Sequence, residues 1–220
     1  MVNMLFSLYN FHEEWAKEIV GRYISSNDNV LIIPFSFGCD ISNDTDWQYA
    51  YNRNYGKYYN SIIIPFLSYG IAEKNINWVN YFSDTKEDAL DKIRKSNMIF
   101  FTGGLPDKMM WRLRKFELVS DIEHYKGTII GSSAGAMIQI YDYHITPDED
   151  YDSFSYNKGL NLIKSFDVEV HYENTELQNN SIDKVLAEKV NKVYAISNSG
   201  GIVVENNTVT TIGDVYKYSS

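Results

Sequence analysis

The sequence predicts a three-layer α/β fold, in which a mainly parallel sheet carries helices on both faces. Short, continuously apolar runs at 30–33 and 98–101 have the composition of strands that are buried on both faces, and the short run at 128–130 is β-branched. Stretches with helical periodicity lie between these runs, and such alternation favours parallel strands joined by helices. The length of 220 residues suits one domain, 1–220, with a full core. We therefore expect functional groups at the carboxyl ends of the strands.

The secondary structure of the first third of the chain is predicted except for one segment, which could be a helix or a strand. In order, we expect a strand at 4–8, a helix from 10 to about 25, the strand 30–33 closed by a proline, and a loop at 36–46. The helix begins at Asn10 because Glu13, three residues later, completes a capping-box pattern. In the segment 47–71 the aromatic spacing favours a helix, but residues 62–65 are equally compatible with a strand.

The rest of the chain continues the alternation and ends in a hairpin. The turn of this hairpin is expected at Asn206-Asn207, since asparagine tolerates the backbone of tight two-residue turns. The expected elements are, in order, a strand at 76–82, a helix from 83 or 84 to 95, the strand 98–101, a helix at 107–116, the strand 128–130, a helix at 134–143, an acidic loop at 145–157, a strand at 168–171, a helix at 182–190, a strand at 193–197 and the hairpin 202–212.

Composition and charge exclude several classes of function. The formal net charge is −9 and the pI is about 4.9, whereas nucleic-acid surfaces and anionic membranes require basic patches. No run approaches 18 apolar residues, and the N-terminus lacks the pattern of a signal peptide. The single cysteine, Cys39, excludes an internal disulfide and suits a reducing compartment. We therefore expect a cytoplasmic protein that binds neither nucleic acid nor membrane.

The strongest chemical signal is a G-x-S-x-G pattern at 131–135, directly after the β-branched run 128–130. A strand, a sharp turn and a helix in this order form a nucleophile elbow, which holds a serine hydroxyl clear of the backbone. The glycines leave room for the tight bend. Ser133 is therefore the expected nucleophile, and the N–H of Ala134, at the start of the next helix, is an expected oxyanion donor.

A serine nucleophile needs a base, and the chain has four histidines. His12 and His124 precede the elbow in segments expected to be helical or helix-flanking, and His144 is expected near the end of the helix after Ser133, pointing away from it. His171 ends a predicted strand, at the edge of the sheet where active sites gather. We therefore expect His171 to be the general base, in the triad order Ser, acid, His.

The acid and the second oxyanion donor are predicted from their positions. An acidic cluster lies between Ser133 and His171, and one of its carboxylates is expected to orient the imidazole. The cluster leaves the choice open among Asp148, Glu149, Asp150 and Asp152. The double glycine 103–104 follows the strand 98–101, so the backbone N–H of Gly104 can approach a ligand closely.

These residues resemble the peptidase E and cyanophycinase group of serine peptidases. The likeness rests on the elbow GSSAGA at 131–136, IIPF at 32–35, FTGG at 101–104 and VHY at 170–172. In that group the acid lies about fifteen residues after the serine, which falls on Asp148. The resemblance implies a fold similar to class I glutamine amidotransferase domains, with serine in place of cysteine. It also implies a peptidase without cofactor or metal that acts on small or acidic peptides, such as dipeptides with an N-terminal aspartate.

The chain also departs from this group. Leu105-Pro106-Asp107 follows the double glycine, where relatives usually carry an asparagine and, two positions later, an aromatic residue. Asn198-Ser199-Gly200-Gly201 stands where relatives often carry a glutamate before glycine. The alternative is thus a catalytically silent binding protein with the same fold. Arg53, Arg112 and Arg114 are the candidates for contact with an acidic substrate, and the choice between monomer and homodimer stays open.

Overall fold

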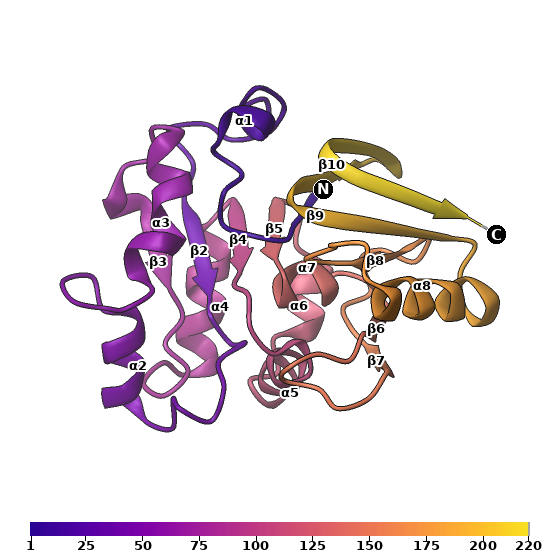
Figure 1. Cartoon of the computed structure of the whole chain (residues 1–220). Coiled ribbons are helices and arrows are strands. Elements are labelled where there is room, and N and C mark those ends of the chain that lie inside the picture. Colours follow the sequence, from indigo (N-terminus) through magenta and orange to yellow (C-terminus); the bar gives the residue numbers. More distant parts are fainter. Residues whose placement is uncertain (220) are drawn as a thin grey trace.

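The computed structural model describes residues 1–219, and a single eight-stranded sheet runs through this part of the chain (Figure 1). Its strands are β1 (Val2–Phe6), β2 (Val30–Ile33), β3 (Ile76–Trp78), β4 (Met98–Phe101), β5 (Thr128–Ser132), β8 (Asp167–Glu169), β9 (Lys192–Glu205) and β10 (Thr208–Ser219). The spatial order is β10-β9-β1-β5-β4-β2-β3, and β8 pairs with β9. All pairs are parallel except β1 with β9 and β9 with β10. The predicted mainly parallel sheet is confirmed.

Helices cover both faces of this sheet. They are α1 (Glu14–Val20), α2 (Asp44–Tyr51), α3 (Tyr59–Ser68), α4 (Lys86–Lys95), α5 (Pro106–Lys115), α6 (Val119–Glu123), α7 (Ala134–Met137) and α8 (Glu176–Glu188), with a short 3-10 turn η1 at Glu73–Asn75. A separate two-stranded sheet is formed by β6 (Asp142–Ile145) and β7 (Ser155–Lys158). Figure 1 shows α8 beside the long β9–β10 hairpin, at the end of the sheet opposite α2 and α3.

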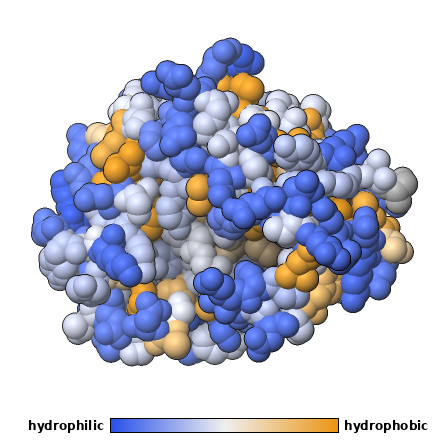
Figure 2. All heavy atoms as spheres, in the orientation of Figure 1, coloured by the Kyte–Doolittle hydropathy of each residue, from blue (hydrophilic) through white to orange (hydrophobic). Residues whose placement is uncertain are grey.

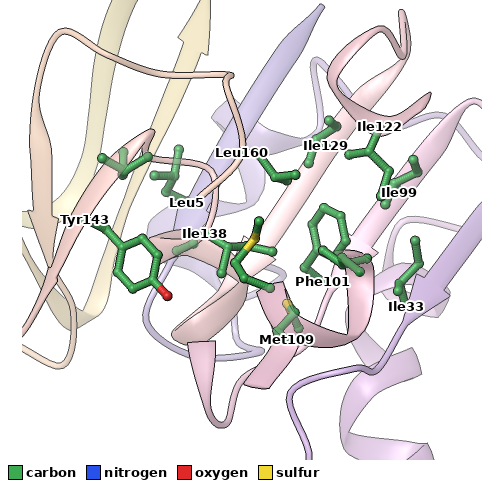
Figure 3. Close-up of a cluster of buried hydrophobic side chains, with 14 of the residues drawn as sticks. Leu5, Ile33, Ile99, Phe101, Met109, Ile122, Ile129, Ile138, Tyr143 and Leu160 are labelled. Atoms are coloured by element: carbon green, nitrogen blue, oxygen red, sulfur yellow. The ribbon is translucent and has the colours of Figure 1, made fainter. Parts of the chain in front are cut away.

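Two cores follow from the alternation of side chains along the strands. Leu31 and Ile33 face one side, where they join side chains from α4, α5, α6 and α7 (Figure 3). Val30 and Ile32 face the other side and pack with α1, α2 and α3. All four side chains are fully buried, as the continuous apolar runs predict. The three-layer arrangement is therefore confirmed.

Several predicted boundaries in the first half need correction. The helix expected from residue 10 begins at Glu14, because the Asn10 side chain donates to the carbonyl of Asn198 rather than capping the helix. The open segment 47–71 forms the helices α2 and α3, and the alternative strand at 62–65 is wrong. The next helix, α4, is capped by Thr85, whose hydroxyl and partner Asp88 form the capping box.

In the second half, the largest error concerns the residues after the elbow. The helix expected at 134–143 ends at Met137, and residues 142–145 form β6 instead. The strand expected at 168–171 ends at Glu169, and α8 begins earlier than expected, after the capping residue Thr175. The hairpin turns at Asn206-Asn207 as predicted, with φ values of 49° and 65°. Its strands are longer than expected, because 193–197 and 202–205 belong to one strand.

The surface is mostly hydrophilic, and Figure 2 shows that this face of the molecule is hollowed near its middle. Within residues 1–219, no helix is long and apolar enough to cross a membrane. The glycine turn after β4, the elbow and the segment after β8 line a common cavity, which is described next.

Candidate active site

Ser133 occupies a strained turn between β5 and α7. Its backbone dihedrals are φ 51° and ψ −116°, a region that costs a residue other than glycine roughly 1–3 kcal/mol. The neighbouring glycines make the turn possible, because a Cβ on Gly131 would lie 2.0 Å from the carbonyl oxygen of Gly135. A Cβ on Gly135 would lie 2.2 Å from the carbonyl oxygen of Phe101. The backbone thus has the shape that the G-x-S-x-G pattern predicts.

His171 lies two residues beyond the end of β8, also with a positive φ of 51°. Its ring nitrogen Nδ1 is 2.9 Å from the side-chain oxygen of Asn198. Because an amide oxygen only accepts, Nδ1 carries the proton, and Nε2 is the nitrogen with a lone pair. His171 therefore has the tautomer that a general base requires.

The segment 6–9, which contains the last residue of β1 and the three residues after it, contacts the backbone of both Ser133 and His171. The buried Ser7 hydroxyl accepts from the backbone N–H of His171 at 2.9 Å and donates to the carbonyl of Ile196 at 2.8 Å. The carbonyl of Phe6 accepts from the N–H of Ser133 at 2.8 Å. The Tyr9 hydroxyl accepts from the N–H of Gly103 at 2.7 Å. This segment thus connects the elbow, the histidine and the glycine turn.

Ser133 and His171 line the same cavity, which has a volume of about 480 Å³. Within the described residues, the Ser133 hydroxyl makes no direct hydrogen bond to the His171 ring. Catalytic hydrogen bonds are often long before substrate binds, so proton transfer between these two side chains stays a prediction for the substrate complex. The cavity also includes Gly104 and Asp148 among its lining residues.

Asp148 does not make the contact to His171 that the spacing argument predicts. Its carboxylate oxygen Oδ1 accepts from the N–H groups of Asp150 and Tyr151, at 2.8 Å and 3.0 Å, and so closes a turn within its own loop. In this structure Asn198, on β9, takes the position at Nδ1 of His171. An acid that orients the histidine from the 148–152 cluster therefore remains a prediction without a supporting contact.

The glycine turn after β4 places a free N–H at the cavity. Gly104 has φ +132°, and a Cβ there would lie 2.5 Å from the carbonyl oxygen of Ser36, so only glycine fits without strain. A Cβ on the neighbouring Gly103 would come within 3.2 Å of the Ser133 Cβ, which places the turn beside the elbow. Within the described chain, the N–H groups of Gly104 and Ala134 donate to no other residue. Gly104 lines the cavity, whereas Ala134 is fully buried directly after Ser133, and the oxyanion roles of both N–H groups stay predictions.

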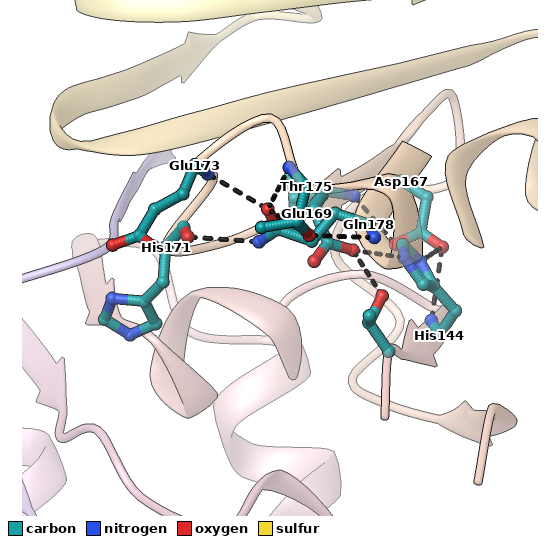
Figure 4. A network of polar contacts seen from close by, with 9 residues as sticks. His144, Asp167, Glu169, His171, Glu173, Thr175 and Gln178 are labelled. Atoms are coloured by element: carbon teal, nitrogen blue, oxygen red, sulfur yellow. Dashed lines mark hydrogen bonds and ion pairs between the residues drawn. The ribbon is translucent and has the colours of Figure 1, made fainter. Parts of the chain in front are cut away.

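His144 occupies a different environment from the one expected. It lies in β6 rather than on a helix, and it is 1% exposed. Its Nδ1 and Nε2 each lie 2.7 Å from a carboxylate, of Asp167 and Glu169 respectively (Figure 4). Ionised carboxylates only accept, so both ring nitrogens donate and the ring is an imidazolium. Burial opposes this charge, but the charges and hydrogen bonds of the two carboxylates outweigh it and raise the His144 pKa from 6.5 to about 10.

The three arginines considered for substrate binding are engaged elsewhere. Arg112 is buried, donates to the carbonyls of Phe35 and Phe37, and lies 3.5 Å from the centre of the Phe37 ring. Arg114 donates to the carbonyl of Lys158. Arg53 forms an ion pair with Glu73 at 2.8 Å. None of the three lines the cavity that holds Ser133 and His171.

A second cavity of about 410 Å³ lies on the other side of the glycine turn. It shares Gly104 and Asp150 with the first cavity, and its lining includes Tyr9, Tyr51 and Tyr58. The double glycine is thus bordered by two hollows, one of which contains the serine and the histidine. Among the residues described, no cluster of three or more histidine, cysteine or acidic side chains is arranged to hold a metal ion.

Sequence reasoning missed three residues of this arrangement. Asn198 was noted only as a departure from relatives, although it contacts the histidine. Ser7 and Tyr9 directly follow the first strand. Their polar side chains at a strand end were the signal by which sequence reasoning could have found them. All three act across large separations in sequence, which local patterns do not report.

Comparison with known proteins places this geometry in a family. The sequence model of Peptidase family S51 matches residues 51–212, which include the elbow, the glycine turn, His171 and Asn198. The chain belongs to peptidase family S51. It is therefore a serine-type peptidase by family, and the resemblance to the peptidase E and cyanophycinase group is confirmed. A comparison with curated protein sequences found no match.

Two crystal structures share the fold of this S51 peptidase. One is a protein provisionally assigned as peptidase E from Listeria monocytogenes EGD-e, with a TM-score of 0.68 and 21% identity. The alignment covers 97% of this chain and 98% of that one. The other is a peptidase from an acI-B1 Actinobacterium, with a TM-score of 0.62, 14% identity, and coverage of 100% and 94%. At these identities the likeness establishes the fold.

Proposed function

We propose that this S51 peptidase cleaves short peptides through an acyl-enzyme, with Ser133 as the nucleophile and His171 as the general base. The observation that carries the proposal is the strained turn at Ser133. This serine lines the same cavity as His171, whose Nδ1 is hydrogen-bonded to Asn198. A serine in a plain structural turn would need neither the strain nor a histidine in the same cavity.

The expected reaction uses only groups of this chain and water. The Ser133 oxygen attacks the carbonyl carbon while its proton passes to Nε2 of His171, and the carbonyl oxygen becomes an anion between the N–H groups of Gly104 and Ala134. The imidazolium then gives the proton to the departing amine as the C–N bond breaks. Water adds to the acyl-enzyme by the same route, and the serine regains its proton from His171.

Asn198 favours a second candidate, a protein that binds peptides but turns them over slowly. In Ser-His-Asp triads a carboxylate stabilises the imidazolium that forms during attack. The amide of Asn198 fixes the tautomer of His171 but carries no charge to offset that of the imidazolium. Slow turnover with an intact nucleophile is therefore the alternative to efficient hydrolysis.

Labelling with a fluorophosphonate separates the candidates. We expect one covalent label on Ser133, located by mass spectrometry of the digested protein, and no label on Ser133→Ala. His171→Ala should slow labelling by at least ~100-fold, since general-base catalysis contributes ~10²–10⁴-fold. His124→Ala is the matched control, because His124 is exposed, does not line the cavity and has its ring hydrogen-bonded to Ser120 of the preceding helix, and it should label like the wild type. A folded wild-type protein that fails to label would refute the nucleophile and favour the binding protein.

A further inference from the structure

The second cavity, of about 410 Å³, lies directly beside the proposed reaction centre. Gly103 and Gly104 belong to its lining, whereas Ser133 and His171 line the first cavity. A Cβ built on Gly103 would lie 3.2 Å from the Cβ of Ser133 and 3.3 Å from the hydroxyl oxygen of Tyr9, which also lines the second cavity. The nucleophile and this cavity are therefore separated by little more than the backbone of Gly103.

The walls of the second cavity are mainly aromatic and aliphatic. Six of the side chains that form them are those of Phe37, Ile41, Tyr51, Tyr58, Ile62 and Leu105. The two carboxylates of the lining belong to the exposed residues Asp40 and Asp150. Walls of this kind gain free energy when an aromatic side chain replaces water against them.

The charges around these walls balance, which favours a neutral occupant. The guanidinium carbon of Arg112 lies 3.5 Å from the centre of the Phe37 ring. The Nζ of Lys57 lies 4.8 Å from the centre of the Tyr58 ring. These two cations stand against the two carboxylates of the lining, so the cavity has no excess charge of either sign. A third cation would also meet repulsion from the two that already contact the rings.

The hydroxyl of Tyr51 points to the kind of neutral side chain that fits. Tyr51 is 6% exposed, and its hydroxyl bonds to none of the described residues. That oxygen is not among the fully enclosed polar atoms, so it is reached from the cavity that Tyr51 lines. Burial raises the pKa of Tyr51, and the nearby hydroxyls of Tyr9 and Tyr58 and the carboxylate of Asp40 raise it further, so the hydroxyl stays protonated. An occupant that displaces water from this hydroxyl must offer it a hydrogen bond in return.

The position of His171 decides which residue of a peptide enters. In the proposed reaction His171 gives a proton to the departing amine, so the residue on the amine side lies toward the first cavity, which His171 lines. The carbonyl of the residue on the acyl side lies at the N–H of Gly104, which borders both cavities. The side chain of the acyl residue therefore has the second cavity beside it.

Resting on the proposed function, we infer that the second cavity binds the side chain of a tyrosine on the acyl side of the bond that is cleaved. The phenol ring packs against the aromatic walls, and its hydroxyl bonds to that of Tyr51. The volume of about 410 Å³ is in the range of small-molecule sites. This acyl-side residue differs from the N-terminal aspartate that the family resemblance implies.

The inference is tested by binding, independently of cleavage. The probes are the dipeptides Tyr-Ala, Phe-Ala, Ala-Ala, Asp-Ala and Ala-Tyr. Calorimetric titration of the folded Ser133→Ala protein should show Tyr-Ala binding at least ~20-fold more tightly than Ala-Ala, because an aromatic side chain leaves water. Tyr-Ala should also bind several-fold more tightly than Phe-Ala and Ala-Tyr. Equal binding of Tyr-Ala with Ala-Ala, Phe-Ala or Ala-Tyr, or a preference for Asp-Ala, would overturn the inference.

Variants of the Ser133→Ala protein then locate the site. Tyr51→Phe should abolish the preference for Tyr-Ala over Phe-Ala and leave the affinity for Phe-Ala unchanged, since it removes only the hydroxyl. Tyr58→Ala should weaken the binding of both peptides several-fold. Tyr55→Ala is the matched control, because Tyr55 is exposed in the same loop and does not line the cavity, and both affinities should be unchanged. A preference for Tyr-Ala over Phe-Ala that survives Tyr51→Phe, in a folded protein, would also overturn the inference.

The same peptides given to the wild-type protein keep the two hypotheses distinct. Cleavage without a preference for Tyr-Ala would leave the serine peptidase standing and remove the specificity. Selective binding of Tyr-Ala without cleavage would keep the specificity and favour the silent binding protein. Preferential cleavage of Tyr-Ala supports both.

Discussion

Replacing Asn198 by aspartate should raise the activity of this peptidase. The side-chain oxygen of Asn198 lies 2.9 Å from Nδ1 of His171, at the position from which a carboxylate stabilises the imidazolium in other triads. Aspartate is nearly isosteric with asparagine, so Asn198→Asp adds a negative charge beside the ring without a change in size. Asn198 is exposed, and the substitution should leave the fold intact.

The size of the effect follows from Coulomb's law. Opposite unit charges about 4 Å apart attract by ~1 kcal/mol in water and by ~4 kcal/mol at the effective dielectric constant near a protein surface. Each ~1.4 kcal/mol changes a rate tenfold, so these two energies correspond to rate increases of about 5-fold and about 1,000-fold. Because Asn198 is exposed and His171 is half-buried, solvent screening applies, and we expect an increase of roughly 10- to 100-fold in the rate of attack.

The assay is the second-order rate of fluorophosphonate labelling, supported by kcat for a cleaved dipeptide. Ser199→Asp is the matched control, because it adds the same charge on the next exposed residue without occupying the position at Nδ1 of His171. An equal increase in Ser199→Asp would assign the effect to net charge. A rate in Asn198→Asp that equals or falls below that of the wild type would refute the role assigned to Asn198.

Three further predictions concern groups around the site. Gly104→Ala should lower kcat at least ~100-fold, measured with the same dipeptide, because its Cβ would displace the turn from Ser36 and misplace an oxyanion donor. His144→Gln should lower the free energy of unfolding in urea by about 3 kcal/mol or more at pH 6, since it leaves paired buried carboxylates without their cation. With the His144 pKa raised to about 10, the decrease in the free energy of unfolding should have its full size below pH ~6.5 and shrink as the pH rises toward 10. A decrease that does not depend on pH would contradict the ion cluster. Tyr9→Phe should cost about 1–3 kcal/mol in the same assay and lower kcat, because it leaves the N–H of Gly103 without an acceptor; unchanged values would exclude that role.

The central strands and the elbow were predictable because their signals are local. Continuous apolar runs such as 30–33 and 98–101 can be satisfied only by burial on both faces, and the structure buries them completely. The bend at Ser133 needs residues without side chains on both sides of it, and the glycines at 131 and 135 therefore predict it. Each of these features is decided within a few residues of chain.

The errors arose where a distant partner decided the outcome. Residues 142–145 pair with 155–158 as strands, so His144 enters the interior instead of ending a helix. Asn10 fits the capping pattern, but its side chain donates to the carbonyl of Asn198 instead of capping the helix. Asp148 has the expected spacing from the serine, but its carboxylate is used by its own loop. Periodicity and spacing carry no information about such competition between partners.

The four-residue segment 6–9 has a consequence for which parts of the chain the activity requires. It precedes the elbow in the sequence, yet through Ser7 it contacts His171 and Ile196, and the neighbouring Asn10 contacts Asn198, 188 positions later. A chain that includes the elbow but lacks β9 contains Ser133, but it lacks the contacts of Ile196 with Ser7 and of Asn198 with His171. If Ser133 and His171 react as proposed, hydrolysis therefore requires β1 to pair with β9, and a chain without β9 would not cleave peptides.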